Sequence, residues 1–352
     1  MDFAIVGCSL DALDAEEKLA MKLAYLYALK EGVVDEVLAR DPYELLVGPL
    51  SELPGVSVAG SLEIESWLTP RPFACDIDYI EPVVYREFVG TSGCAVIAAH
   101  LREFVKSRVL PLRPLLVGVD HSLTGGVVEA LAGNGTRPAL IVLDSHFDAV
   151  PTAVRRAALG PEAVGAGGPG TEEVGQAEPP AGCNCGTWLG AIVDEGLVDP
   201  ENVVVIGVSD HPGHDVTDGE PEGMALYRDS YLSFEERGMT VLTKRKLREQ
   251  GVEKSVAEAV AGLEGRQVYV SVDADIGSGE EVKAVRFLDT LGLSVDEVLR
   301  VARSLRAWLA GSGCELAGFD IMEVDVHLAD IPHSGDRTVE MCLALARELM
   351  GP

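Results

Sequence analysis

The sequence predicts a three-layer α/β fold with a mainly parallel β-sheet at its centre. Short runs of β-branched and apolar residues occur without the polar alternation of a half-exposed strand, which indicates strands buried on both faces. Segments with helical periodicity separate these runs, and this alternation is typical of a parallel sheet covered by helices on both sides. We find no internal repeat and expect a single domain over residues 1–352.

The expected elements follow from the two periodicities, with strands at the apolar runs and helices where apolar residues recur at helical spacing. The expected strands are residues 3–7, 43–48, 115–119, 139–143, 203–208, 240–242, 268–272 and 316–324. The expected helices are residues 15–31, 92–109, 125–131, 186–195, 226–237, 244–262, 295–309 and 338–350. Prolines break the pattern between residues 50 and 85, so no element is predicted there.

Residues 158–182 form a Gly/Pro-rich insert without apolar periodicity. A structureless stretch of this length inside a compact domain is usually a functional lid or a disordered insert. As a lid it would bring Glu172, Glu173 and Glu178 to a cationic substrate. The sequence leaves both interpretations open.

The chain is long enough for a sizeable core and is strongly acidic. Of its 352 residues 47% are hydrophobic, and the formal net charge is −29. That charge argues against nucleic acid and anionic membranes as partners, and favours a cationic substrate, metal ions or simple solubility. No apolar run approaches the roughly 20 residues that span a bilayer.

The cysteine pattern and the amino terminus favour the cytoplasm. Seven cysteines are scattered along the chain, and the pair Cys183 and Cys185 has no second pair at zinc-binding spacing. An odd number of dispersed cysteines suits a reducing compartment. The first residues carry no basic segment and soon turn acidic, so no signal peptide is predicted.

Acidic and histidine side chains follow three of the predicted strands. Asp273 and Asp275 come directly after strand 268–272, and side chains two apart on an extended segment point to the same side. The others are His121 after strand 115–119, and Asp144, His146 and Asp148 after strand 139–143. Because active sites of parallel α/β sheets lie at the carboxyl ends of the strands, we expect these side chains to converge.

Together these residues offer two imidazoles and four carboxylates, without a thiolate. This set suits manganese better than structural zinc or magnesium, although zinc, cobalt and nickel would also bind. Six ligands are too many for one ion and suit two ions that share carboxylates. A helix cap or a solvated turn would explain one Asp pair, but three such segments in this order favour a metal site.

The segments resemble motifs of the ureohydrolase family, which includes arginase, agmatinase and formiminoglutamase. GVDHS at 118–122 is similar to its Gly-Gly-Asp-His-Ser motif, DSHFD at 144–148 to its Asp-Ala-His-x-Asp motif, and SVDAD at 271–275 to its Ser-x-Asp-x-Asp motif. GFDIMEV at 318–324 is similar to the closing motif that ends Glu-Val-Asn-Pro. The resemblance runs from about residue 115 to the carboxyl terminus and implies an arginase-like fold.

The resemblance implies two Mn²⁺ ions per chain, with a hydroxide between them that attacks a guanidinium carbon. Glu323 would face that guanidinium through paired, charge-assisted hydrogen bonds. One ion would be held by His121, Asp144, Asp148 and Asp273, and the other by His146, Asp275 and the bridging Asp144 and Asp273.

The chain departs from the family pattern at three places. Cys185 stands where the family has a histidine that shuttles protons to the leaving amine, and a thiol is a poor replacement near neutral pH. Residues 276–294 replace the Asp-Pro and Gly-Thr-Gly-Thr-Pro segment, and residues 325–327 replace the Asn-Pro after Glu323. These segments line or support the substrate pocket in relatives, so no substrate is carried over.

Residues 209–215 follow another predicted strand on the same edge of the sheet. The corresponding loop contacts the distal end of the substrate in relatives. Asp210 is therefore predicted to bind a distal amine, or His211 or His214 to supply the missing proton. A histidine-bearing surface loop is the alternative.

These observations predict a manganese-dependent hydrolase of linear amidines or guanidines that releases urea or a similar fragment. We expect a small cationic substrate, agmatine-like ahead of arginine-like. The alternatives are a formiminoglutamase-like or other C–N hydrolase, and a metal-binding relative without turnover, which Cys185 favours. The resemblance also implies a homo-oligomer, either a trimer or a hexamer.

Overall fold

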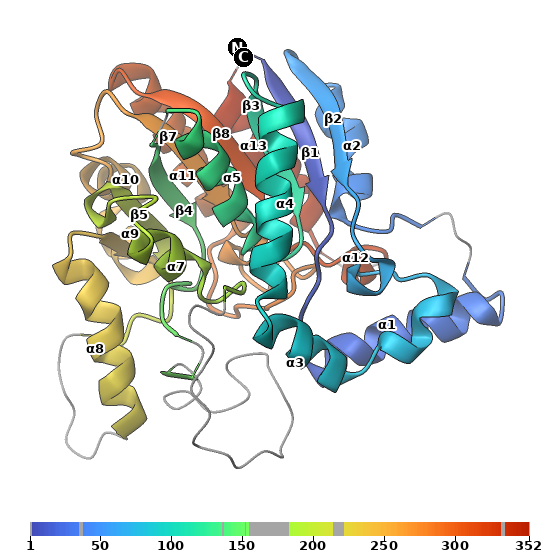
Figure 1. Ribbon diagram of the computed structural model, residues 1–352. Coiled ribbons are helices and arrows are strands. Elements are labelled where there is room, and N and C mark those ends of the chain that lie inside the picture. Colours follow the sequence, from blue (N-terminus) through green and yellow to red (C-terminus); the bar gives the residue numbers. More distant parts are fainter. Residues whose placement is uncertain are drawn as a thin grey trace.

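The computed structural model describes residues 2–34, 38–135, 137–151, 153–154, 183–213, 222–331 and 335–351. Within these ranges eight strands form one all-parallel sheet, in the order β2-β1-β3-β8-β7-β4-β5-β6. Helices cover both faces of the sheet (Figure 1), which confirms the predicted three-layer α/β fold. The insert at 158–182 lies outside the described residues.

The helices and strands have the following bounds. The strands are β1 (Phe3–Cys8), β2 (Val56–Leu62), β3 (Arg113–Gly118), β4 (Ala139–Leu143), β5 (Val203–Val208), β6 (Thr240–Thr243), β7 (Gln267–Val272) and β8 (Glu315–Ile321). The α-helices are α1 (Glu16–Lys30), α2 (Pro42–Ser51), α3 (Pro82–Gly90), α4 (Gly93–Arg108), α5 (Leu123–Gly133), α7 (Trp188–Asp194), α8 (Glu222–Glu236), α9 (Lys244–Gln250), α10 (Val252–Ala259), α11 (Val295–Gly311), α12 (Val326–Ala329) and α13 (Thr338–Met350). Short 3-10 helices are η1 (Ser66–Leu68), η2 (Ala74–Tyr79), η4 (Pro200–Asn202) and η5 (Ala274–Ile276).

Alternate strand residues contribute to two apolar layers, one on each side of the sheet. Ile5 and Val117 belong to the layer that α2, α10, α11 and α13 cover. Val6 and Leu116 belong to the layer that α4, α5, α7 and α8 cover. Because side chains alternate between the faces, a strand covered on both sides must be apolar at every position. This explains the uninterrupted apolar runs of the sequence.

Residues 43–48 are helical, so the strand predicted there is wrong. They lie within α2, where Oδ1 of Asp41 caps the first turn by accepting a hydrogen bond from Glu44 N at 2.8 Å. Leu46 and Leu50 are fully buried one turn apart, in the apolar layer under α2. The cap and the helical spacing of these leucines outweigh the β-propensity of the neighbouring tyrosine and valine.

Other elements also differ from the prediction. The helix α3 was not predicted. The edge strand β2 was not predicted, because it is partly exposed and lacks a continuous apolar run. The helix predicted over 244–262 is broken into α9 and α10 at Gly251, whose φ of +88° is left-handed and favours glycine.

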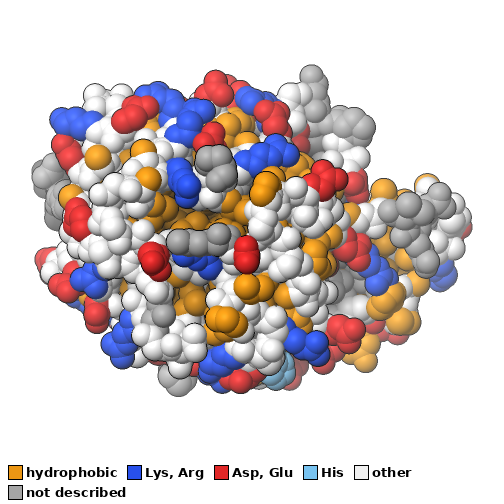
Figure 2. Space-filling view, turned by 90° about the horizontal axis from the view of Figure 1, so that it is seen from above, with side chains coloured by type: hydrophobic (Ala, Val, Ile, Leu, Met, Phe, Trp, Pro, Cys, Tyr) orange, Lys and Arg blue, Asp and Glu red, His pale blue; other side chains and the backbone are white. Residues whose placement is uncertain are grey.

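The surface on the side of the chain termini is mixed in charge. Figure 2 looks onto this face, where Lys, Arg, Asp and Glu side chains are interspersed among apolar and neutral ones. Mixed surface charge of this kind favours solubility. It does not indicate a partner that is either strongly acidic or strongly basic at this face. Among the described helices, none combines the length and the apolar character needed to cross a membrane.

A close contact between α4 and α5 gives a test of this packing. A Cβ atom at Gly126 would lie 2.2 Å from the backbone carbonyl oxygen of Ala98. We expect Gly126→Ala to lower the free energy of unfolding by about 1–3 kcal/mol, because overpacking a rigid contact costs that much. Denaturant unfolding measures the change.

Gly311→Ala is the matched control, because a Cβ atom at that position in α11 meets nothing within 4 Å. Its stability is expected to be unchanged or higher, since alanine is the better helix former. Equal effects of the two substitutions would contradict the close approach of α4 and α5.

Candidate metal centre

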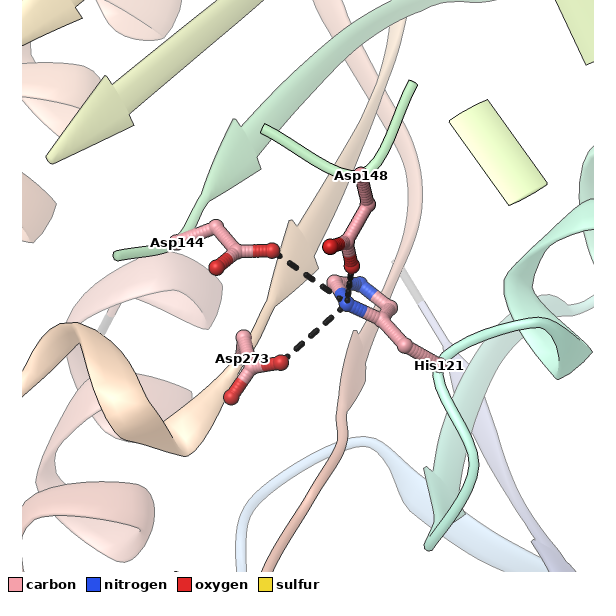
Figure 3. A group of neighbouring side chains, drawn as sticks. All are labelled: His121, Asp144, Asp148 and Asp273. Carbon is pink, nitrogen blue, oxygen red and sulfur yellow. Dashed lines mark ion pairs between the residues drawn. The ribbon is translucent and has the colours of Figure 1, made fainter. Parts of the chain in front are cut away.

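The four strands that precede most of the candidate site residues are neighbours in the centre of the sheet. They lie in the order β3, β8, β7 and β4, and they run parallel. Their carboxyl ends therefore bring the following side chains to one place. Figure 3 shows His121, Asp144, Asp148 and Asp273 pointing toward one another there.

Three carboxylates surround one nitrogen of His121. Nδ1 of His121 lies 3.4 Å from an oxygen of Asp144, 3.2 Å from one of Asp148 and 3.2 Å from one of Asp273. All four side chains are buried. One ring nitrogen carries at most one proton and cannot donate to three acceptors at once. Buried carboxylates this close repel one another unless a cation lies among them.

Asp144 also belongs to a second group, with His146 and Asp275. Nδ1 of His146 lies 2.9 Å from Oδ2 of Asp275 and 3.6 Å from Oδ1 of Asp144. Within each of the two groups, the possible ligand atoms lie within 4.8 Å of one another. Asp144 turns Oδ1 to His146 and Oδ2 to His121, so its carboxylate is placed to bridge two ions.

Several polar atoms of the two groups are buried without a hydrogen bond. Among the described residues, these include Nδ1 of His121 and Oδ2 of both Asp144 and Asp275. Unpaired buried polar atoms are costly and rare in native proteins, and a coordinated ion would satisfy them. Imidazole nitrogens and carboxylate oxygens are suitable donors for divalent transition metals. The residues present therefore fit a pair of divalent ions.

A chain of hydrogen bonds sets the orientation of His121. Oγ of Ser271 lies 2.8 Å from Nε2 of His121 and donates to Oδ1 of Asp320 at 2.8 Å. Because the hydroxyl proton goes to Asp320, Oγ accepts from Nε2, which fixes the proton of the neutral ring at Nε2. The lone pair of Nδ1 then points to the three carboxylates, as a metal ligand requires.

The pKa values of the buried groups reflect an excess of negative charge. Burial alone would lower the pKa of His121, but Asp144, Asp148 and Asp273 outweigh it and raise that pKa well above its usual value. Burial and the charges of Asp275 and Asp144 raise the pKa of Asp273. Because metal ligands must be deprotonated, metal binding at these residues is expected to release protons.

Glu323 follows β8 and lies beside His121. The strand ends at Ile321, earlier than predicted, and Glu323 has a left-handed φ of +64°. Such a backbone conformation is uncommon in a residue other than glycine, costs free energy and is enriched at functional sites. Oε1 of Glu323 accepts hydrogen bonds from the backbone N–H of His121 at 3.1 Å and from Nη1 of Arg286 at 2.9 Å.

Three residues of the site were missed by the sequence reasoning. Trp188 donates from Nε1 to Asp148 at 3.3 Å, and its ring centroid lies 4.7 Å from that of His121. Asp320 supports His121 through Ser271 and lies buried within β8. Arg286 is bound to Glu323. Trp188 and Asp320 lie inside a predicted helix and a predicted strand, so nothing in their sequence positions marked them as site residues. Arg286 could have been found, because it is a charged residue between the apolar Val285 and Phe287 in a loop that follows a metal motif.

Cys185 is half-buried after the segment that the structure does not describe. Burial and the charges of Asp120 and Glu323 raise the pKa of its thiol well above the usual value. The thiol is therefore protonated at neutral pH.

The loop after β5 is placed through contacts with α8. The carboxylate of Asp210 accepts hydrogen bonds from the Tyr227 hydroxyl at 3.0 Å and from the Phe147 N–H at 3.3 Å. Nε2 of His211 lies 3.3 Å from a carboxylate oxygen of Glu235. The His211 ring also packs on Tyr231, which stacks on Phe147 of the second metal motif. His214 lies outside the described residues.

The sequence model of the arginase family matches residues 73–351. A curated protein, proclavaminate amidinohydrolase of Streptomyces clavuligerus, is 28% identical to this chain over 211 residues, which is 60% of this chain. The match spans 53% of the length of that relative, about half.

Solved structures show the same fold. Arginase from Bacillus subtilis matches with a TM-score of 0.60 at 18% identity, covering 100% of this chain and 99% of that one. Proclavaminate amidinohydrolase from S. clavuligerus gives 0.56 at 20% identity, covering 99% and 90%. Formimidoylglutamase from B. subtilis gives 0.56 at 14% identity, covering 99% and 87%. These similarities establish an arginase-like fold.

The shared carboxylate leads to a prediction about metal content. The purified protein soaked in Mn²⁺ should hold about two ions per chain, because two ligand groups are present. Asp144→Ala should lose both ions, whereas Asp275→Ala should keep the ion at His121. Elemental analysis after removal of free metal measures the content. Retention of one ion by Asp144→Ala would contradict the bridging role.

The support of His121 leads to a second prediction. Ser271→Ala removes the acceptor for Nε2 of His121 and should weaken Mn²⁺ binding about tenfold, as such losses do in other metal sites. Competition with a chelator measures the affinity. Ser233→Ala is the control, because Ser233 is exposed on α8 and, in the described contacts, its hydroxyl donates only to the backbone carbonyl of Ser230. Equal affinity of both variants would show that Ser271 does not orient the ligand.

Proposed function

Because this chain belongs to the arginase family, we propose that it is a manganese-dependent hydrolase of linear amidines or guanidines. The observation that carries the proposal is the pair of ligand groups that share Asp144, all of whose members except the partly exposed His146 are buried. A relative without turnover would have less reason to keep two adjoining groups with unpaired ligand atoms. We therefore propose an enzyme rather than a metal-binding protein with only a binding or regulatory role.

We propose two Mn²⁺ ions per chain at these groups. One is assigned to His121, Asp144, Asp148 and Asp273, and the other to His146, Asp275 and the shared Asp144. Asp273, predicted from the resemblance as a second bridging ligand, belongs only to the group of His121 in the structure and is kept as a bridge in the proposal alone. When bound, the ions supply a water of lowered pKa as the nucleophile for the carbon of the C–N bond. Trp188 and Ser271 hold Asp148 and His121 in position for that arrangement.

Glu323 is proposed to orient the substrate. Its Oε1 accepts a hydrogen bond from the backbone N–H of His121 at 3.1 Å, which supports the proposal that a group bound to this carboxylate lies close to the first ligand group. Of the two carboxylate oxygens of Glu323, Oε1 accepts hydrogen bonds, whereas Oε2 accepts none from the described residues. Asp210 is proposed to bind a distal amine of the substrate, in exchange for one of its present contacts.

The leaving amine needs a proton. We assign its transfer to His211 or His214, with Cys185 as the alternative. An unperturbed imidazole has a pKa near 6.5 and exchanges protons at neutral pH, whereas an ordinary thiol near 8.5 does so less readily. His211 would have to leave Glu235 in order to reach the site.

The proposal also covers the charge of the substrate, the cellular location and the oligomeric state. A small cationic substrate agrees with the net charge of −29. The seven cysteines are all free, which agrees with a cytoplasmic location. We also propose a homo-oligomer, a trimer or hexamer, which sedimentation would test.

A second candidate is a formiminoglutamase-like or other C–N hydrolase, acting on a group other than guanidinium. The observation that favours it is the ion pair of Glu323 with Arg286. The carboxylate proposed for the guanidinium of a substrate already binds a guanidinium of this chain.

The activity is tested with Glu323→Gln. A screen of guanidino and amidino compounds with added Mn²⁺ should find release of urea or ammonia by the wild type. Glu323→Gln should lower kcat at least about a hundredfold, since it loses the charged acceptor, and should keep the metal content. Loss of metal together with activity would instead make Glu323 a ligand or a structural residue.

The proton donor is tested by three variants measured on any substrate found. His211→Ala or His214→Ala should lower kcat by about a hundredfold, as expected for general acid catalysis, and Cys185→Ser should lower it less. The pH–rate profile should lose its limb near neutrality in the histidine variant that matters. If both histidine variants keep the wild-type rate while Cys185→Ser is inactive, the assignment is reversed.

A further inference from the structure

Arg286 is fixed beside Glu323 by the backbone as well as by its side chain. Val285 and Val324 form an antiparallel bridge. Next to it, Arg286 N donates to the carbonyl oxygen of Glu323 at 2.9 Å. The guanidinium therefore lies at Glu323 because of how the loop 276–294 pairs with the segment after β8.

The guanidinium of Arg286 is buried among three carboxylates. Nη1 lies 2.9 Å from Glu323 and 3.5 Å from Asp120, and Nη2 lies 3.1 Å from Asp11. The side chains of Arg286 and Glu323 are only 2% and 1% exposed. Burial alone would lower the pKa of Arg286, but the three carboxylates raise it, so Arg286 is charged. Breaking a buried ion pair of this kind is strongly unfavourable.

The two oxygens of the Glu323 carboxylate are used unequally. Oε1 accepts from the His121 N–H and from Nη1 of Arg286. Oε2 is buried and accepts no hydrogen bond among the described residues. The carboxylate thus offers one free acceptor, and the positive charge of Arg286, which Asp120 and Asp11 share, lies directly beside it.

A guanidinium needs the opposite arrangement. It binds a carboxylate best through two parallel N–H···O bonds, and it gains from an unbalanced negative charge. At Glu323 it would find one free oxygen and would lie a few ångströms from the like charge of Arg286. An uncharged group that donates one N–H to Oε2 needs only one free oxygen, and it is not repelled by the charge of Arg286.

We propose that Arg286 sets the charge class of the substrate, and that the site takes an uncharged C–N group, such as a ureido group, in preference to a guanidinium. The proposal rests on the second candidate function above. In the reaction, the oxygen of water adds to the ureido carbon and the C–N bond to the alkyl nitrogen breaks. That nitrogen takes a proton, so the products are an amine and carbamic acid.

Matched ligands test the proposal by binding, without a need for turnover. Agmatine and N-carbamoylputrescine have the same chain with a guanidinium or a ureido end, and arginine and citrulline form a second pair. Calorimetry on the Mn²⁺-loaded wild type should give the ureido member of a pair the lower Kd, by about tenfold or more, because of the like charge. A guanidinium member that binds equally or more tightly overturns the proposal, and so does the absence of binding by all four.

Two variants show whether Arg286 is the cause. Arg286→Gln removes the charge and should reverse the preference, so that the guanidinium member binds more tightly. Arg286→Lys keeps the charge and should keep the preference for the ureido member. An unchanged preference in Arg286→Gln overturns the proposal, since a merely structural role would not discriminate by charge. If Arg286→Gln does not fold, the wild type still tests the preference for the ureido member, and a reversed preference in Arg286→Lys, which keeps the charge, overturns the role of that charge.

Metal content and product release, measured on the same samples, report separately on the proposed function. A protein that prefers the ureido ligands but hydrolyses neither member of a pair keeps the role of Arg286 and loses the proposed activity. A protein that hydrolyses the guanidinium ligands faster has the activity, and it contradicts the role of Arg286.

Discussion

Buried negative charge is the constraint on which the rest of the site depends. Four carboxylates and two imidazoles meet at the carboxyl ends of adjacent strands, and Nδ1 of His121 alone faces three of the carboxylates. Among the described residues, Ser271 and Trp188 contact these ligands, and both are neutral groups that hold the ligands in orientation. The central strands place the ligands, and two apolar layers keep those strands rigid.

Next to His121, a second group of buried carboxylates is partly neutralised by a cation of the chain itself. Arg286 lies among Glu323, Asp11 and Asp120, so this second group of carboxylates carries its own cation. The two neighbouring sites therefore differ in what they can accept. The ligand groups fit metal ions, whereas Glu323 already has a cation of the chain beside it and only one oxygen without a hydrogen bond among the described residues. Membership of the arginase family defines the fold and the metal chemistry to be expected, and Arg286 bears on which substrate such a site would take.

The sequence allowed the sheet and the candidate ligands to be located because both depend on local patterns. Apolar runs mark buried strands, and His121, Asp144 and Asp273 follow those strands directly. The helix α2 was mistaken for a strand because its cap at Asp41 decides against the β-propensity of its residues. The edge strand β2 is half-exposed and lacks the apolar signal. The contacts of Arg286 could not be predicted, because Asp11, Asp120 and Glu323 lie far from it in sequence.

The central claim is that the two ligand groups hold a pair of ions joined by Asp144. It is tested most directly by a crystal structure of the Mn²⁺-soaked protein, with anomalous diffraction recorded on both sides of the manganese edge. The account predicts two anomalous peaks, one against His121 and one against His146, with the carboxylate of Asp144 between them. A single peak, or a pair in which Asp144 contacts only one ion, would contradict it.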